Sequence, residues 1–323
     1  MPSLELGAGE VSAHANAMAT EITVRVAGDF TGRRRDECAL AVERALRVFG
    51  DVEDSCTRFD PASPLMRANE RPDKWHQLPL LCFDAVVEAW RAYEMTGGRF
   101  DPRVLEDLVA LGYDRSLPFA EGAVTVDAPI PKRRLSRPRW NPRFRRARGE
   151  VCLGGFPIDL GGIGKGLGVR WASAALRRAA PDFVVDAGGD CYCAGLAPEG
   201  GPWRVGVEDP TGGPGPVLVV ALSDQAAATS SIRVRRWNAD GVPVHHLIDP
   251  RSGLPGGQGL LAVTVVGPDP ALAEVWSKVL FLAGSAGVAS QAAHHSVAAC
   301  WVTQDGTTGV SAAMEAFVEW RGA

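Results

Sequence analysis

The sequence lacks a long apolar segment, an excess of positive charge and the pattern of a secretory leader. No uninterrupted apolar run approaches the roughly 18 residues that a membrane-spanning helix needs, and the formal net charge of the 323 residues is −4. A negative balance gives no overall attraction to nucleic acid. The first residues include acidic side chains but no basic segment followed by an apolar one. These absences predict a cytoplasmic protein with no membrane span and no nucleic-acid partner.

The seven cysteines do not have the pattern of a disulfide framework. They are odd in number and scattered from Cys38 to Cys300, whereas disulfide-rich secreted proteins are short and carry paired cysteines. We therefore expect reduced thiols. Cys191 and Cys193 would point to one face of a strand, but no second Cys or His pair has the spacing of a zinc site. We expect no metal at these two cysteines.

Length and composition are those of a globular protein with a large core. The chain is 46% hydrophobic and 22% charged, which is close to the average for such proteins, and it contains no repeat of fixed period. We expect a flexible arm over residues 1–16 and a single domain over residues 17–323. The predicted strands and helices do not follow a strict βα order. This mixture favours an α+β fold, with two packed layered halves, over a doubly wound parallel sheet.

Hydrophobic periodicity locates the main elements of this fold. Apolar residues at helical spacing predict four helices, over residues 36–54, 78–98, 166–180 and 271–283. Alternating or continuous apolar runs predict strands at residues 21–28, 182–190, 203–209, 217–223, 260–266 and 297–302.

An arginine-rich segment covers residues 132–148 and includes two aromatic residues, Trp140 and Phe144. Such a segment could be a nucleic-acid or phosphate patch, or a hairpin whose arginines are solvated. No nucleic-acid-binding fold surrounds it and the whole chain is acidic, so we favour the solvated hairpin.

The most informative local pattern is the segment IDLGGIGKGLGVR, residues 158–170, in which four glycines surround Lys165 just before a predicted helix. Glycine lets backbone N–H groups approach an anion, and a helix N-terminus favours negative charge. The spacing matches neither the P-loop nor the dinucleotide-binding fingerprint. The pattern predicts a phosphate cradle, and the alternative is a glycine-rich turn with a solvated lysine.

Three further segments place polar side chains in turns. HLIDPRSG, residues 246–253, offers a histidine that could be a general base, although Asp-Pro-x-x-Gly is also a common turn. RFDP, residues 99–102, and VDAGGD, residues 185–190, each place an Asp beside Gly or Pro, where its carboxylate could accept backbone N–H groups or bind a ligand.

The order of these segments resembles the FAD:protein FMN transferases of the ApbE family. The succession runs over nearly all the chain, from about Met18 to about residue 300, and DLGGIGKG and HLIDPRSG are its most specific parts. The other matching segments are AMAT (17–20), SCTRFDPASPLMRAN (55–69), TGGRFDP (96–102), DAGGD (186–190) and ATS (228–230). The resemblance implies an FAD cleft between two α/β layers, and transfer of FMN to a Thr or Ser of an acceptor flavoprotein with release of AMP.

The resemblance also assigns site residues. His246 would lie near the acceptor hydroxyl, Asp249 would hold its loop, and Lys278 would belong to the catalytic group. The residues expected to bind FAD are Met18, Phe100, Asp101, Asp159, Gly161, Gly162, Lys165 and Ile248.

The family's magnesium ligands correspond to Gly162, Glu274 and Ser277, but Lys278 stands where the family has a metal-binding Thr. A charged ammonium offers no lone pair to a cation. Lys278 could replace the charge of the metal, or pair with Glu274 at i,i+4. The chain could also hold FAD intact, as a flavin-dependent oxidoreductase or a flavin carrier. We favour the transferase, because the nucleotide site is complete and one positive charge can substitute for another.

Overall fold

The computed structural model describes residues 3–7, 10–28, 30–119, 122–134 and 136–322, and it has the predicted α+β fold. Nine strands form one large sheet in the order β1-β2-β3-β8-β9-β12-β17-β18-β19. Every neighbouring pair in this sheet is antiparallel. The strands are β1 (Ser3–Gly7), β2 (Glu10–Ala17), β3 (Thr20–Ala27), β8 (Phe183–Ala187), β9 (Asp190–Ala194), β12 (Gln225–Ser231), β17 (Leu260–Gly267), β18 (Ala298–Thr303) and β19 (Thr308–Val310).

The prediction of a flexible arm over residues 1–16 is wrong where the structure describes this segment. Strand β1 pairs with β2, and β2 pairs with β3 from Glu10 opposite Ala27 to Ala17 opposite Thr20. Residues 1–2 and 8–9 lie outside the described part of the chain. Inward positions of β2 are largely alanine, which has a low strand propensity and gives a weak signal in the sequence.

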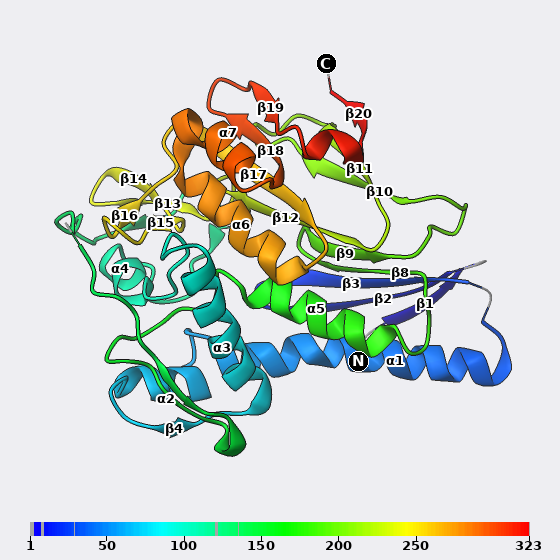
Figure 1. Ribbon diagram of the computed structural model, residues 1–323, viewed down its shortest axis with the longest axis horizontal. Helices are drawn as coiled ribbons and strands as arrows, with labels where there is room; N and C mark the ends of the chain where they lie inside the picture. Colours follow the sequence, from blue (N-terminus) through cyan, green and yellow to red (C-terminus); the bar gives the residue numbers. More distant parts are fainter. Residues whose placement is uncertain (1–2, 8–9, 29, 120–121, 135, 323) are drawn as a thin grey trace.

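Helices cover one face of the large sheet (Figure 1), where α1 packs against β2 and β3, α5 packs against β8 and β9, and α6 packs against β12 and β17. Apolar side chains of α1, α5 and α6 meet those of β3, β8, β12 and β17 in the largest core cluster. The helices are α1 (Gly32–Cys56), α2 (Pro64–Glu70), α3 (Leu80–Met95), α4 (Leu105–Ala110), α5 (Gly164–Leu176), α6 (Pro270–Leu282) and α7 (Gly284–His294).

A small antiparallel sheet packs against the large sheet, and side chains of both sheets form a second core. It consists of β10 (Trp203–Glu208), β11 (Pro216–Leu222) and β20 (Val318–Arg321), in the order β10-β11-β20. Cys191, Cys193 and Cys300 lie together in this core. All seven cysteines are free thiols, as the sequence predicts.

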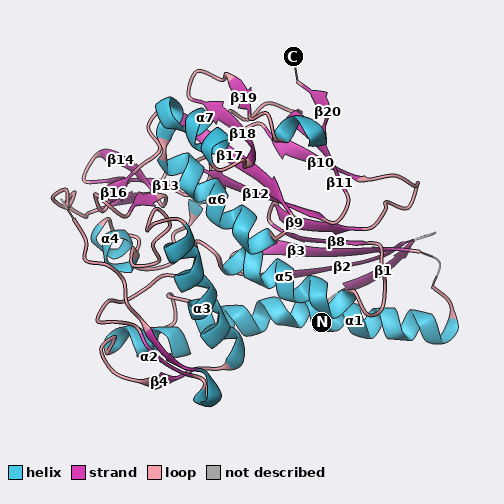
Figure 2. Cartoon of the chain, in the orientation of Figure 1, coloured by secondary structure: helices cyan, strands magenta, loops and turns pink. Residues whose placement is uncertain are grey.

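The remaining elements form the end of the molecule shown at the left of Figure 2. Helices α2, α3 and α4 lie there with three small sheets, and part of this end shares a core with the start of α5 and with α6. The strands are β4 (His76–Gln77), β5 (Thr125–Val126), β6 (Arg143–Arg145), β7 (Glu150–Cys152), β13 (Arg236–Ala239), β14 (Val242–His245), β15 (Ile248–Asp249) and β16 (Leu254–Pro255).

The arginine-rich segment 132–148 is only partly the solvated hairpin that the sequence favours. Arg139 is 75% exposed and pairs with Glu94 at the surface. In contrast, Arg137 is only 10% exposed, and its Nη2 donates to Asp107 Oδ2 at 2.7 Å. Arg134 pairs with the same carboxylate. These inner arginines therefore fix the segment to α4, which the local sequence could not show because the partner lies about 30 residues away. Residue 135 lies outside the described part.

Across the ranges that the structure describes, no helix is both long enough and apolar enough to cross a membrane.

Candidate functional site

A cleft of about 420 Å³ opens where the large sheet's helices meet the end formed by α2–α4. This volume is within the usual range of small-molecule sites, roughly 300–1,000 Å³. The cleft brings together segments that are far apart in the sequence, which include the β2–β3 turn, the end of α1, the start of α5, the 246–250 loop and α6. Its cationic lining residues are Arg58, Arg99, Lys165, Arg235 and Lys278, and its acidic ones are Glu53, Asp101 and Asp159. This excess of cations suits an anionic ligand.

The glycine-rich segment forms one wall of the cleft, as predicted. Helix α5 begins at Gly164, and Gly161, Gly162, Gly164 and Lys165 all line the cavity. A Cβ on Gly162 would lie 3.0 Å from the ring of Phe100, which is buried beside it. Glycine is therefore needed at position 162 to let the loop approach the aromatic ring, and the loop stays open to a ligand.

Met18 also lines the cleft beside the glycine-rich loop, and its backbone conformation is uncommon. Both Met18 and Ala19 have positive φ, 55° and 57°, in the tight turn between β2 and β3. This conformation is uncommon for residues other than glycine. The Met18 N–H donates to Glu53 Oε1 at 2.9 Å, and the Met18 methyl group packs toward Gly164. The hydrogen bond from α1 holds the turn in place beside the glycine loop.

Asp159 is not free to bind a ligand, because both of its oxygens have protein partners. Oδ1 accepts the Gly161 N–H at 2.8 Å, and Oδ2 lies 3.1 Å from Arg58 Nε. The guanidinium of Arg58 lies 4.2 Å from the ring centres of both Phe59 and Tyr113. Its Nη1 donates to the Tyr113 carbonyl oxygen, and its Nη2 is buried and has no hydrogen-bond partner in the described structure. Arg58 therefore belongs to the wall of the cleft as a guanidinium beside aromatic rings, with one unpartnered nitrogen among the described residues.

Asp101 also binds a neighbouring side chain. Its Oδ1 accepts the backbone N–H and Nε of Arg103, and its Oδ2 accepts Arg103 Nη2 at 2.7 Å. The carboxylate thus closes a turn and lines the cleft only at its edge. A role for Asp101 in holding Phe100 in position fits this geometry better than a direct contact with a ligand.

His246 is the histidine that faces the cleft. Its Nδ1 lies 3.1 Å from the carbonyl oxygen of Arg235, and since a carbonyl only accepts, Nδ1 carries the proton. Burial lowers the pKa of His246 well below its ordinary value, and the charges of Arg235 and Lys278 lower it further. The ring is therefore neutral at pH 7, with Nε2 unprotonated. Such a nitrogen can accept a proton from a hydroxyl group.

Lys165 does not project freely into solvent. Its ammonium pairs with Asp190 Oδ2, and the other Asp190 oxygen accepts the Thr229 N–H at 2.9 Å. Burial alone would lower the pKa of Lys165, but the carboxylates of Asp190 and Glu274 outweigh burial and the pKa is raised. Lys165 is therefore a fixed positive charge at the start of α5.

The residues predicted to hold magnesium do not form a magnesium site. Glu274 is 1% exposed, its Oε2 accepts the Gly166 N–H at 2.8 Å, and its Oε1 lies 3.1 Å from Lys278 Nζ. Ser277 is fully buried and hydrogen bonds to Ser230. Among the described residues there is no group of three His, Cys, Asp or Glu side chains that could hold a metal ion. Mg²⁺ requires near-octahedral oxygen ligands, and these oxygens are engaged by other donors.

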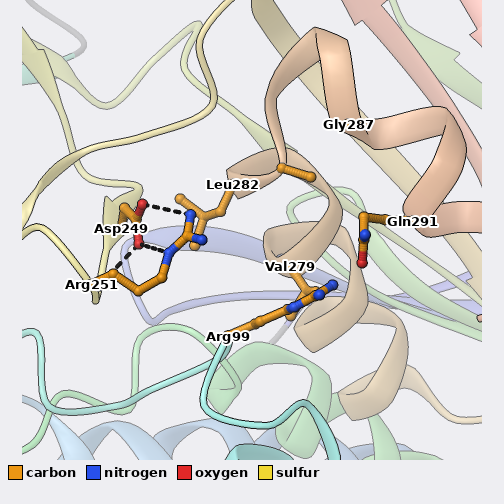
Figure 3. A pocket seen from close by; sticks show the side chains of 8 residues that line it. Arg99, Asp249, Arg251, Val279, Leu282, Gly287 and Gln291 are labelled. Carbon is orange, nitrogen blue, oxygen red and sulfur yellow. Dashed lines mark hydrogen bonds and ion pairs between the residues drawn. The ribbon is translucent and has the colours of Figure 1, made fainter. Parts of the chain in front are cut away.

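Asp249 lies in a second, smaller cavity of about 210 Å³ next to the cleft. Figure 3 shows its carboxylate pairing with Arg251, whose Nη2 lies 2.9 Å from Oδ2. Arg99 borders both cavities. Asp249 also accepts the backbone N–H of Arg251 at 3.0 Å within the turn that follows His246, and it does not line the cleft.

The cleft collects most of the residues predicted from the sequence and adds others. The predicted residues that line it are Met18, Phe100, Asp101, Asp159, Gly161, Gly162, Lys165, His246, Ile248 and Lys278. Asp249, Glu274 and Ser277 lie beside or beneath it. The cleft is also lined by residues that were not predicted, namely Glu53, Arg58, Tyr113, Phe119 and Arg235. Of these, Glu53 lies in the predicted helix 36–54, and Arg58 lies in the segment 55–69 that resembles the family.

The protein thus has an α+β fold with a cleft that combines cationic side chains, a glycine-rich helix start and aromatic rings. The sequence model of the ApbE family matches residues 18–301, and the chain belongs to this family.

Two curated relatives, both named FAD:protein FMN transferase, illustrate the similarity. The protein of Treponema pallidum is 30% identical over 211 residues, which cover 59% of this chain and 56% of the relative. The protein of Salmonella typhimurium is 27% identical over 206 residues, which cover 62% of this chain and 59% of the relative. The matches thus span less than two thirds of these relatives' length.

Solved structures show the same fold over almost the whole chain. The ApbE protein from Thermotoga maritima has a TM-score of 0.77 at 23% identity, covering 99% of this chain and all of that one. The flavin transferase ApbE from Vibrio cholerae has a TM-score of 0.74 at 20% identity, covering 98% of this chain and all of that one.

Proposed function

We propose that this chain is an FAD:protein FMN transferase, which moves the FMN part of FAD to a Thr or Ser hydroxyl of an acceptor flavoprotein and releases AMP. One observation carries the proposal: His246 presents an unprotonated Nε2 in a cleft that is also lined by five cationic side chains and by the glycine-rich start of α5. The curated relatives are named for this activity, and we infer an acceptor flavoprotein for this chain from that name.

The chemistry is transfer of a phosphoryl group between oxygens. The acceptor hydroxyl oxygen forms a bond to the FMN phosphorus, and the bond from that phosphorus to the oxygen bridging it to AMP breaks. The electron pair leaves with AMP, and the hydroxyl proton passes to His246 Nε2. Catalysis of such a step depends on alignment and on stabilising the charge that develops on the phosphate oxygens.

The lining residues support a division of the cleft into two regions. Arg58, Tyr113 and Phe119 form an aromatic region suited to a flat ring, with one unpartnered guanidinium nitrogen among the described residues. Lys165 and the glycine loop form a cationic region suited to phosphates, as helix N-termini commonly are. In this proposal Met18, Phe100, Gly161, Gly162, Lys165 and Ile248 bind FAD. Asp101 and Asp159, which were also expected to bind FAD, hold Phe100 and Arg58 in position instead, and Asp249 holds the loop of His246.

The alternative is a protein that holds FAD without cleaving it, as an oxidoreductase or a carrier. The comparisons do not favour this alternative. The cytoplasmic location stays a prediction, and the seven free thiols are consistent with it.

The test is to incubate the purified protein with FAD and a Thr-bearing flavoprotein acceptor and to measure AMP by chromatography. The matched control is the same acceptor with Ala in place of that Thr. The proposal predicts AMP release only with the Thr-bearing acceptor. FAD that stays whole with both acceptors would instead support the FAD-holding alternative.

A further inference from the structure

We propose that the ammonium of Lys278 is the cation that this cleft presents to the phosphates of FAD, so that neither binding nor transfer requires a divalent metal ion. The inference rests on the proposed function for the transfer step, but its binding part stands on the geometry of α6 alone.

Lys278 is placed to reach a ligand in the cleft. It lies in the last turns of α6, lines the cavity, and its side chain is 16% exposed. Its Cδ and Cε pack within about 3.5 Å of the position that a Cβ on Gly162 would occupy, so the aliphatic part is held against the glycine loop. The ammonium has three N–H donors, and the structure gives one of them a protein partner, Glu274. The others remain for phosphate oxygens.

Glu274 holds this ammonium in position rather than a metal ion. Its side chain is 1% exposed, and it connects the start of α5 to α6 through the Gly166 N–H on one oxygen and Lys278 on the other. A divalent ion bound to Glu274 would have to displace the ammonium or lie within a few ångströms of it. Either arrangement is unfavourable, because like charges repel strongly away from bulk water.

The phosphate region gathers cations from three segments of the chain. Lys165 pairs with Asp190, and Lys278 pairs with Glu274. Arg235 and Asp186 lie near enough to Lys165 for their charges to interact with its charge. As the bond to AMP breaks, negative charge builds up on the departing phosphate, and a fixed ammonium stabilises it without reorganisation.

The first experiment measures metal binding directly, with Mn²⁺ as the probe. Mn²⁺ is titrated into the FAD-loaded protein and the free ion is followed by electron paramagnetic resonance, while the dissociation constant of FAD is measured by flavin fluorescence with EDTA or with Mg²⁺. We expect no stoichiometric Mn²⁺ binding and an unchanged FAD dissociation constant. One tightly bound Mn²⁺ per protein, or FAD binding that EDTA abolishes, would overturn the inference.

The second experiment removes the charge. Lys278→Met should raise the FAD dissociation constant about 10- to 100-fold, the scale of a lost charge-assisted hydrogen bond, whereas Lys278→Arg should retain most of the affinity. Lys74→Met is the matched control, since Lys74 is 66% exposed and pairs with Asp73 away from the cleft. Equal FAD affinity of Lys278→Met and the wild type would contradict the proposal.

A third variant tests whether the absence of Mg²⁺ dependence is due to the ammonium of Lys278. Lys278→Thr replaces the cation with an oxygen ligand beside Glu274, and we expect FAD binding and AMP release to become dependent on Mg²⁺. An unchanged metal response in Lys278→Thr would count against the inference. If the wild type releases no AMP with any acceptor, the proposed function fails, while the Mn²⁺ and FAD-affinity measurements still decide the role of Lys278.

Discussion

Protonation of His245 should destabilise the fold at mildly acidic pH. His245 precedes His246, and its ring packs edge-on against Phe281 with 6.0 Å between ring centres. Its Nδ1 accepts the Leu247 N–H at 3.3 Å. Burial lowers the pKa of His245 to about 4, compared with about 6.5 in an unfolded chain. The ring is therefore neutral in the folded protein at pH 5 but mostly charged in the unfolded one.

The magnitude follows from the two pKa values. Because the folded-state value is the lower one, the stabilising contribution is present above about pH 6.5 and is lost as the pH falls toward 4. For one group with pKa values of about 4 and about 6.5, the free energy of unfolding decreases by about 2 kcal/mol between pH 7.5 and pH 5.

The assay is urea unfolding of the wild type and of His245→Asn across this pH range. Asparagine keeps an acceptor near the position of Nδ1 and cannot be protonated, so the variant should lose about 2 kcal/mol less than the wild type on acidification. His294→Asn, on the exposed part of α7, is the matched control for the substitution itself. Parallel pH curves for the wild type and His245→Asn would refute the reasoning.

Three further outcomes are expected. His246→Asn keeps a donor for the Arg235 carbonyl but has no Nε2. It should slow FMN transfer by about 10²- to 10⁴-fold, as loss of a general base does, and leave the FAD dissociation constant unchanged. Loss of both FMN transfer and FAD binding would make the role of His246 structural. Gly166→Ala would place a Cβ 2.5 Å from the Pro270 carbonyl oxygen and should lower the free energy of unfolding by about 1–3 kcal/mol in urea, while Gly50→Ala, with open space around it, should not destabilise. Arg58→Met leaves Asp159 buried without its cation and should lower the free energy of unfolding by about 3–5 kcal/mol in the same assay. Adding Asp159→Asn to this variant should recover part of the lost stability. An unchanged free energy of unfolding in Arg58→Met would contradict the ion pair.

The parts of the fold that the sequence predicted are those with a strong local signal. Helix α3 and its end at Gly97 and Gly98 follow from apolar spacing and from glycines with positive φ. Strand β2 and helix α7 were not predicted. Their inward positions are mostly small, so they are set by pairing and packing with distant segments rather than by their own periodicity.

The same distinction applies to the candidate site. The ion pair of Glu274 with Lys278 was among the predicted alternatives, because four residues on a helix face one another. The pair of Arg58 with Asp159 joins residues about 100 positions apart, and nothing in either segment specifies it. Local sequence therefore identified only some of the charged residues of the cleft, such as Asp159, Lys165 and Lys278, while the packing of α1 against α5 decides which charges are already paired.

The most direct test of the central claim is the intact mass of a Thr-bearing flavoprotein acceptor after a single turnover with FAD-loaded protein. We expect the acceptor mass to increase by that of FMN minus one water, because the hydroxyl loses its proton when the phosphoester forms, with one AMP released for each acceptor modified. An acceptor of unchanged mass, with FAD recovered whole from the protein, would contradict it.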